Sequence, residues 1–280
     1  MSFLGKKIPV HEYIELSYGQ VALAAVLILV NAAISILLHL KMERLLFIAA
    51  GRTVVQLLMV GLVLEWVFRW EKWYAVIGLG TVMTMIAVWT VLYQRTWRYS
   101  GDWFASMTAM WLSAWSVTAY VLALVLHGSA PWYTPQYAIP LLGMVLGNSL
   151  NGIALGMNAF TESIVAQRGQ IESLLAVGAT RWEASREAMQ HAMRTGTMPI
   201  INSMLVVGLV SLPGMMTGQL VSGMEPIQAV KYQIVIMFMT ASATALGTVL
   251  AVVGSFYRLF NQDHQLLIHR IRPVDRRAAR

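Results

Sequence analysis

Several polar side chains lie within long apolar runs of this sequence and are candidates for a functional site. An ionisable group in such a run is costly in hydrocarbon and is therefore a functional candidate. Arg52 is the clearest case, and Gln56 follows one helical turn later on the same face. Either this pair contributes to a polar path, or the helix starts deeper in the chain and the Arg52 side chain extends to the membrane surface.

Three asparagines lie on one face of another apolar run, Tyr137–Asn158. On a helix, Asn148, Asn151 and Asn158 fall within about 80° of one another. An amide in hydrocarbon needs a partner, so this face meets either neighbouring helices or a polar path for a substrate. Packing and substrate lining are both open on the sequence alone.

A third candidate is the pair Pro213-Gly214 within the run Met198–Leu220. Proline cannot donate the helical hydrogen bond, so carbonyl groups are freed near Pro213. Such carbonyls are satisfied by protein, water or a passing ligand. Met215 and Met216 add thioether sulfur, a soft metal ligand, although most of the 18 methionines of this apolar chain serve packing. The segment is either a substrate site or a packing kink, and no metal-ligand set is firmly assigned.

Absent motifs limit the function. The sequence has no HExxH, no GxSxG and no paired carboxylates within the apolar runs, and its six histidines lie in loops or at run ends. We therefore expect a transport subunit rather than an enzyme. The phosphate-binding pattern GxxxxGK[ST] is also absent, so we expect this chain to bind no cofactor, with ATP and Mg²⁺ on a separate ATPase subunit.

Composition assigns the chain to a class. It has 280 residues, of which 58% are hydrophobic and 12% charged, with a mean hydropathy of +0.62. A soluble protein of this kind would expose large apolar patches, and the lack of cysteine excludes a disulfide scaffold. We predict an all-α integral membrane protein with about seven membrane-spanning helices. The apolar runs are Tyr18–Leu38, Leu45–Leu64, Trp73–Tyr93, Trp103–Leu126, Tyr137–Asn158, Met198–Leu220 and Tyr232–Gly254.

Basic residues orient these runs. The net charge of +7 would suggest nucleic acid in a soluble protein, but in a membrane protein the positions of the charges matter more, and we expect no nucleic-acid partner. With the N-terminus outside, fourteen Lys and Arg lie on the inner side and five on the outer side. This predicts an extracytoplasmic segment 1–17, a transmembrane domain 18–257 and a basic cytoplasmic tail 258–280.

One connection, residues 159–197, is much longer than the others. Strong helix formers fill it, and Gly178-Ala179-Thr180 interrupts them as the end of one helix and the N-cap of the next would. We predict a cytoplasmic helix–turn–helix. It offers a surface to a soluble partner, or it is a solvated linker.

Several of these segments resemble one family. The most specific are residues 211–216, with the sequence SLPGMM, and residues 231–234, KYQI, accompanied by Gly51-Arg52, Gly147-Asn148 and Gly178-Ala179-Thr180. From about Leu45 to Phe260 the chain resembles the FetB-like permease family. Its members are membrane subunits of ABC transporters, implicated in iron export in bacteria and in aluminium tolerance in plants.

The resemblance implies a metal-exporting permease that forms a homodimer with two ATPase subunits in the bacterial inner membrane. It also implies an ATPase-coupling role for the helical loop, because Glu172 and Gly178 have the first spacing of the importer coupling segment, although Pro199 comes about two helical turns late. The alternatives are an ATP-independent channel or carrier, or an ABC permease for a non-metal solute. The coupling candidates are Glu172, Gly178, Ala179, Thr180 and Arg181.

Overall fold

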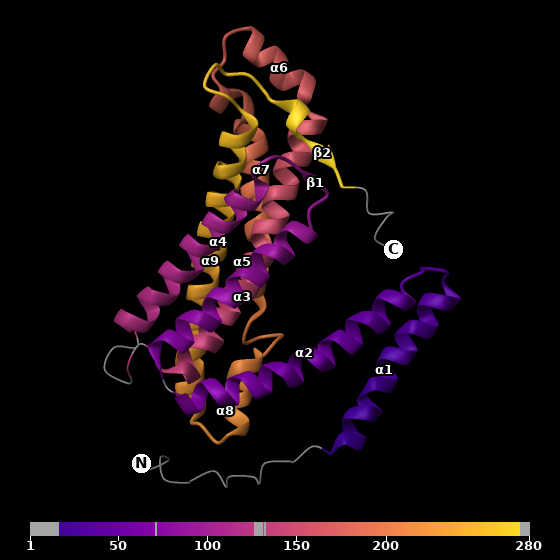
Figure 1. Cartoon of the computed structure of the whole chain (residues 1–280), viewed down its shortest axis with the longest axis vertical. Coiled ribbons are helices and arrows are strands. Elements are labelled where there is room, and N and C mark those ends of the chain that lie inside the picture. The colour runs from indigo at the N-terminus through magenta and orange to yellow at the C-terminus, as the bar shows by residue number, and fades with distance from the viewer. Residues whose placement is uncertain (1–16, 71, 126–130, 132, 275–280) are drawn as a thin grey trace.

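The computed structural model describes residues 17–70, 72–125, 131 and 133–274, and it is almost entirely helical (Figure 1). The predicted all-α membrane fold is confirmed. The helices are α1 (Tyr18–Leu37), α2 (Glu43–Trp70), α3 (Trp73–Tyr93), α4 (Asp102–Tyr120) continued by the π-helix η1 (Val121–Val125), α5 (Pro135–Ala166), α6 (Arg168–Ala176), α7 (Arg181–Val206), α8 (Gly214–Val221), α9 (Pro226–Leu259) and the 3₁₀ turn η2 (Ile268–Arg270). Two short strands, β1 (Trp97–Arg98) and β2 (Arg272–Pro273), pair antiparallel.

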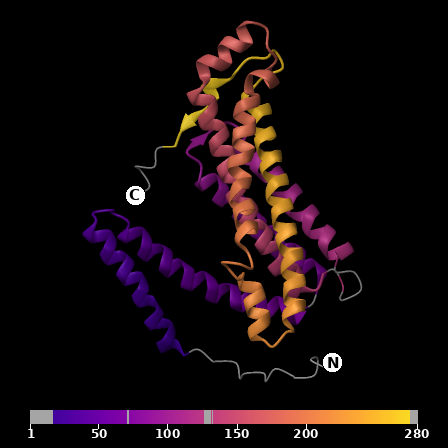
Figure 2. The same cartoon turned by 180° about the vertical axis from the view of Figure 1, so that it is seen from behind.

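Six helices of the described chain are long and apolar enough to cross a membrane: α1, α2, α3, α4 with η1, α5 and α9. The predicted seventh run, Met198–Leu220, is not one helix. Its first residues belong to α7, which begins in the predicted loop at Arg181, and an irregular segment of residues 207–213 separates α7 from α8. Together α7 and α8 still extend from one end of the bundle to the other (Figures 1 and 2).

Helix α5 is the centre of the bundle. It packs against α9 and α7 most extensively and also against α3 and α4. The approach is close where α5 crosses α7, since a Cβ built on Gly196 would lie 2.5 Å from the Gly152 carbonyl oxygen. Small residues at helix crossings allow this packing, which is the main source of association between helices in lipid.

The hairpin of α1 and α2 has a different environment. It leans away from the bundle in both views, and Val67 is the one buried residue of α2 in the described chain (Figures 1 and 2). Val67 belongs to a small buried cluster with Val76 of α3 and with Ala138 and Ile139 of α5. The hairpin therefore joins the bundle at one end and diverges from it toward the other.

Candidate transport path and coupling surface

The turn between α6 and α7 has the local structure that the sequence predicts. Gly178 has φ +93°, and the Gly178 and Ala179 amides donate to the carbonyls of Leu175 and Leu174, which closes the end of α6. Thr180 then caps α7. Its Oγ1 accepts from the Glu183 amide at 3.3 Å, while Glu183 Oε2 accepts from the Thr180 amide at 2.8 Å.

These hydrogen bonds also change the pKa of the acidic side chain at the N-terminus of α7. Donation from the Thr180 hydroxyl and then from its amide lowers the pKa of the Glu183 carboxyl. The carboxylate is therefore ionised at neutral pH and lies in the first turn of α7, where negative charge is favourable. The turn is thus a fixed geometric element rather than a loose linker.

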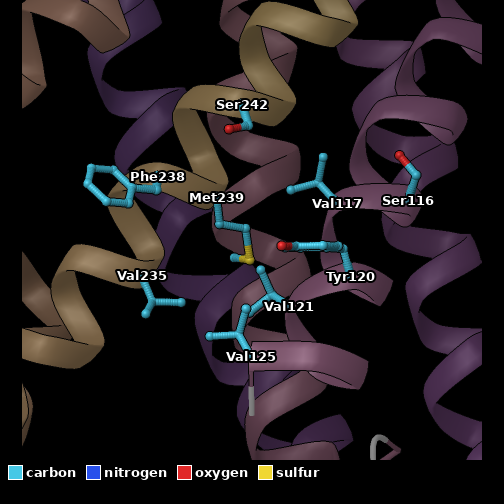
Figure 3. Close-up of a pocket in the computed structure, with 9 residues that line it drawn as sticks. All are labelled: Ser116, Val117, Tyr120, Val121, Val125, Val235, Phe238, Met239 and Ser242. Atoms are coloured by element: carbon cyan, nitrogen blue, oxygen red, sulfur yellow. The ribbon is translucent and has the colours of Figure 1, made fainter. Parts of the chain in front are cut away.

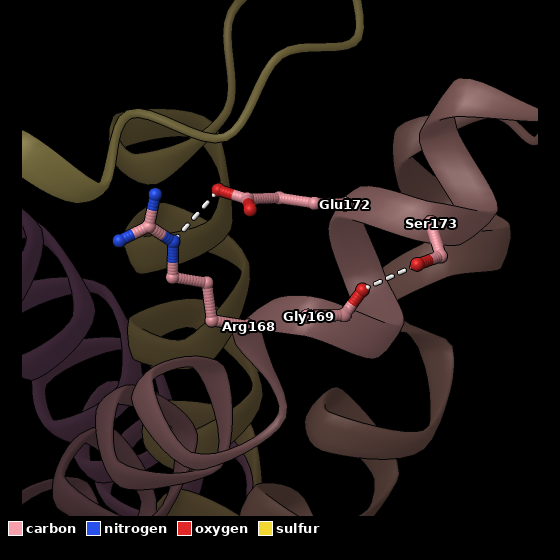
Figure 4. A network of polar contacts seen from close by, with 4 residues as sticks. All are labelled: Arg168, Gly169, Glu172 and Ser173. Atoms are coloured by element: carbon pink, nitrogen blue, oxygen red, sulfur yellow. Dashed lines mark hydrogen bonds and ion pairs between the residues drawn. The ribbon is translucent and has the colours of Figure 1, made fainter.

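The outer surface of α6 combines charge with apolar side chains. Glu172 Oε1 accepts from Arg168 Nε at 2.8 Å, and one turn along the helix Ser173 Oγ donates to the Gly169 carbonyl (Figure 4). The Glu172 carboxylate is exposed, and so is Val177, whose exposed fraction is 82%. An exposed apolar side chain beside fixed charges is suited to contact with a soluble protein.

The chain beyond α9 folds back onto this turn. Arg181 donates from its amide to His264 Nδ1 at 3.1 Å and from its guanidinium to the Asn261 carbonyl at 2.8 Å. The same guanidinium lies 5.5 Å from the ring centroids of Phe256 and Tyr257 at the end of α9. The predicted basic tail therefore includes a folded part that holds the first residue of α7.

A second contact of this folded part reaches the connection between α3 and α4. Strand β2 pairs with β1 of that connection, and the Val274 amide donates to the Thr96 carbonyl at 3.0 Å. The chain after α9 therefore joins both the connection of residues 94–101 and the α6–α7 turn.

Arg95, in the connection between α3 and α4, is fully buried. Its guanidinium donates to Thr161 Oγ1 of α5 at 3.0 Å and lies 5.4 Å from the centroid of the Tyr99 ring, while Tyr99 hydrogen-bonds Ser255 of α9 at 2.6 Å. Burial lowers the pKa of Arg95 and raises that of Tyr99. This network links α5 and α9 through the connection between α3 and α4.

The three asparagines of α5 have different environments. Asn158 makes two bonds to the chain after α3, one from Nδ2 to the Gln94 carbonyl and one from the Thr96 amide to Oδ1, both at 3.1 Å. Asn148 and Asn151 are exposed, and Asn148 Nδ2 donates to the Met144 carbonyl of its own helix at 2.9 Å. The structure thus gives Asn158 a structural contact and leaves the other two amides on the surface of the single chain.

The segment around Pro213 lies at the opposite end of the bundle from α6. Pro213 is the N-cap of α8 rather than a residue within a helix, and α8 packs chiefly against α9. Met215 packs against the main core, and Met216 is half-buried. Nearby in sequence, Gln219 Oε1 is buried and has no hydrogen-bond partner among the described residues. The predicted break is present, and it places the buried Gln219 amide oxygen and the two partly buried thioethers on the short helix that follows it.

The other predicted pair, Arg52 and Gln56, lies on α2 far from these groups. With the amide oxygen facing the guanidinium, Gln56 accepts from Arg52 Nε at 2.8 Å. Both side chains are exposed. A single chain therefore does not gather the predicted path residues into one site. Their roles in transport stay predictions.

A cavity of about 550 Å³ lies between α4 with η1 and α9 (Figure 3). Its lining is mostly apolar, with hydroxyl groups from Ser116, Tyr120 and Ser242. None of the path residues predicted from the sequence lines it. It opens between two helices of the bundle, and its composition is suited to an apolar chain rather than to a hydrated cation.

Comparison with known proteins places this chain in a family. The chain matches the sequence profile of the Uncharacterised protein family (UPF0014) over residues 18–260. The chain belongs to this family. It is 39% identical to the UPF0014 membrane protein slr1647 of Synechocystis over 92% of this chain and 99% of that protein. No solved structure matches the chain.

Two further relatives in this family carry names that refer to metals. The Probable iron export permease protein FetB of Escherichia coli is 32% identical over 90% of this chain and 95% of its own. The Protein ALUMINUM SENSITIVE 3 of Arabidopsis thaliana is 29% identical over 89% of each chain. The chain is thus a multi-pass membrane protein of a permease family.

Sequence reasoning missed the hydroxyl groups where α5, α7 and α9 cross. Thr240 of α9 bonds the carbonyl four residues earlier, as helical threonines do, whereas Thr244, Thr248 and Ser149 have buried hydroxyls without a hydrogen-bond partner among the described residues. The four-residue spacing of threonines along α9 was the available signal. Thr244 and Thr248 lie beside Gly152, where α5 and α7 approach closely.

Proposed function

We propose that this chain is the membrane-spanning permease subunit of an ATP-driven exporter of iron or another metal. The ATPase is a separate subunit that binds ATP and Mg²⁺, and the permease forms a homodimer in the bacterial inner membrane. The support from comparison is membership of a permease family and similarity to a relative named as a probable iron export permease.

The observation that carries the proposal is the fixed α6–α7 turn. Glu172 and Val177, which precede the turn, are exposed. Arg181, which follows it, is hydrogen-bonded to the chain after α9. A force applied by a soluble ATPase at α6 would be transmitted along α7, whose far end adjoins the break before α8. An ATP-independent carrier would need no such surface.

The substrate chemistry follows from the polar groups available. Asp and Glu side chains are absent from the middle of the described spans, so a hard cation would lack carboxylate ligands there. Amide oxygens and the Met215 and Met216 sulfurs bind a cation only weakly, which allows release. We infer that the metal crosses partly hydrated or chelated, so direct sulfur ligation is not required.

The test of coupling uses a pair of glycines on one hairpin. Gly178 has positive φ, so Gly178→Ala strains the turn by about 1–2 kcal/mol, whereas Gly169 lies within α6 with open space around it and tolerates alanine. In vesicles with the co-purified ATPase, we expect iron-stimulated ATP hydrolysis to be uncoupled from iron transport by Gly178→Ala and by Glu172→Lys, and to be unchanged by Gly169→Ala. Transport that needs no ATPase would contradict the proposal.

Two further measurements examine orientation and ligands. A reporter fused after Arg280 should be cytoplasmic and one inserted near Ser129 external, both positions being outside the described residues, because the basic residues gather at one end. Replacing Met215 and Met216 by Leu keeps their volume and should preserve iron resistance in cells. Loss of resistance with unchanged expression would instead establish sulfur ligation.

A further inference from the structure

Arg52 is a cation on a membrane-spanning helix, and no acidic side chain among the described residues pairs with it. Its described polar partner is the neutral Gln56 amide. The acidic residues of α2 are engaged elsewhere, since Glu43 accepts from Ser35 and Glu65 pairs with Arg69. Both lie about 13–20 Å along the helix from Arg52. A guanidinium in hydrocarbon requires more acceptors than one amide.

A matching surface occurs on α5. Asn148 and Asn151 are exposed on the face that no described helix covers, and their amide oxygens accept no hydrogen bond from the described residues. Lipid tails offer these amides neither a donor nor an acceptor. We define the α5 face by Gly147, Asn148 and Asn151, and the α2 surface by Gly51, Arg52 and Gln56. The α5 face has amide oxygens without hydrogen-bond donors among the described residues, and the α2 surface has a guanidinium that can donate to them.

Both surfaces lie on the same side of one shared cluster, at similar distances along their helices. Helices α2 and α5 share the buried cluster that contains Val67 and Ile139. Measured along the helices from this cluster, Arg52 is 15 residues away, about 22 Å, and Asn151 is 12 residues away, about 18 Å. Because helices α2 and α5 diverge from this cluster (Figure 1), the α2 surface does not reach the α5 face of its own chain.

The glycines beside these polar groups allow close approach. A Cβ built on Gly51 or on Gly147 would meet nothing within 4 Å. Small residues next to polar groups are typical of helix–helix contacts in membranes, where backbones approach and side chains hydrogen-bond across the interface. The α2 surface thus supplies hydrogen-bond donors, the α5 face supplies acceptors, and both carry a glycine that allows close approach.

We propose that a second copy of this chain covers both surfaces, so that Arg52 of each copy donates to the Asn148 and Asn151 amides of the other. A two-fold axis generates the contact twice, which closes the dimer. This inference rests on the homodimer of the proposed function and specifies which residues make it. It places the path candidates of α2 and α5, which are separate in one chain, in a single intermolecular cluster.

Cysteine cross-linking tests the contact directly, because the natural chain has no cysteine. Two differently tagged copies are co-expressed in membranes without any ATPase, one with Arg52→Cys and the other with Asn151→Cys, and treated with a short bismaleimide. We expect a cross-linked species that carries both tags. The matched control is Val54→Cys, which is exposed at the same depth on the opposite side of α2 and should give no such species.

Three outcomes would overturn the proposal: no cross-link from the Arg52 and Asn151 positions, equal cross-linking from Val54, or a cross-link within one chain when both cysteines are on the same copy. A second measurement uses uncharged variants in lipid vesicles. Arg52→Leu should raise the dissociation constant of the dimer about threefold to tenfold, and adding Asn151→Leu should have little further effect. An additive effect would mean that the two residues do not interact.

The two proposals fail independently. A cross-linked dimer that neither binds an ATPase nor exports metal would remove the proposed function and keep the interface. ATP-driven iron export by a chain whose Arg52 and Asn151 positions never cross-link would do the reverse.

Discussion

The α1–α2 hairpin and the α3–α9 bundle are both apolar, yet they differ in how much of that apolar surface is buried. None of the most apolar stretch of α2 and 11% of that of α1 is buried, compared with 56% for α5 and 44% for α9. The bundle helices carry glycines and hydroxyl residues at their crossings, whereas the hairpin surface consists largely of bulky aliphatic side chains. Close packing between helices therefore follows small residues rather than hydropathy.

Two arginines give the sharpest form of this comparison. Arg95→Ala should lower the free energy of unfolding by about 3 kcal/mol, because it removes a buried side chain together with a charged hydrogen bond to Thr161. Arg69→Ala in the hairpin removes an exposed pair with Glu65 and should change it by less than about 0.5 kcal/mol. Thermal unfolding of both variants in detergent provides the measurement. Equal unfolding midpoints for the two variants would mean that the surroundings of Arg95 are no more tightly packed than the hairpin. Arg95→Met is the control that keeps most of the side-chain volume and removes the charge.

Two glycines test packing alone. Gly196→Ala places a methyl group against the Gly152 carbonyl and Thr248, and we expect a loss of about 1–3 kcal/mol. Gly61→Ala in α2 meets nothing within 4 Å and should be neutral or stabilise its helix by up to about 1 kcal/mol. Both are measured by thermal unfolding in the same detergent. A destabilising Gly61→Ala would indicate that another surface already covers the hairpin at that position.

The smallest expected effect concerns two helix N-termini with the same capping arrangement. Ser17 and Gln20 cap α1 as Thr180 and Glu183 cap α7, but only Glu183 titrates. Since its pKa is lowered in the folded protein, its capping contribution is complete above the ordinary value of 4.5 and is lost as the pH falls through the lowered pKa. The amide resonance of Glu183 should shift in acid while that of Gln20 does not. Glu183→Gln should abolish the shift, and its persistence in that variant would assign it to another group.

Local features were predictable because the residues that make them are adjacent in the chain. Gly178 and Thr180 specify the turn between α6 and α7, and Pro213 specifies a break, since each acts through its own backbone and immediate neighbours. Asn158 was placed on a face with Asn148 and Asn151 by helical periodicity, which is correct. Its partners Gln94 and Thr96 are more than 60 residues away in sequence, so periodicity alone did not predict its structural contact.

Distant partners also account for the residues that were missed. The charge count placed Arg95 among the fourteen basic residues of the predicted cytoplasmic side. Its local sequence did not predict that it is buried against Thr161, which is 66 residues away, and Tyr99. The contact of His264 with Arg181 joins the predicted tail to the predicted coupling turn across 83 residues. Both contacts form only after the helices assemble.

The amino-acid sequence alone indicated that the chain crosses a membrane, approximately where its six apolar helices lie, and which residues form the α6–α7 turn. These features depend on transfer of side chains from water to an apolar phase and on local backbone conformation. Which apolar faces are buried, and which polar groups such as Arg95 and Asn158 find partners, depends on the assembled fold. Lipid and protein interior are equally apolar, so hydropathy does not distinguish them, and the choice depends on shape and hydrogen bonding between distant segments.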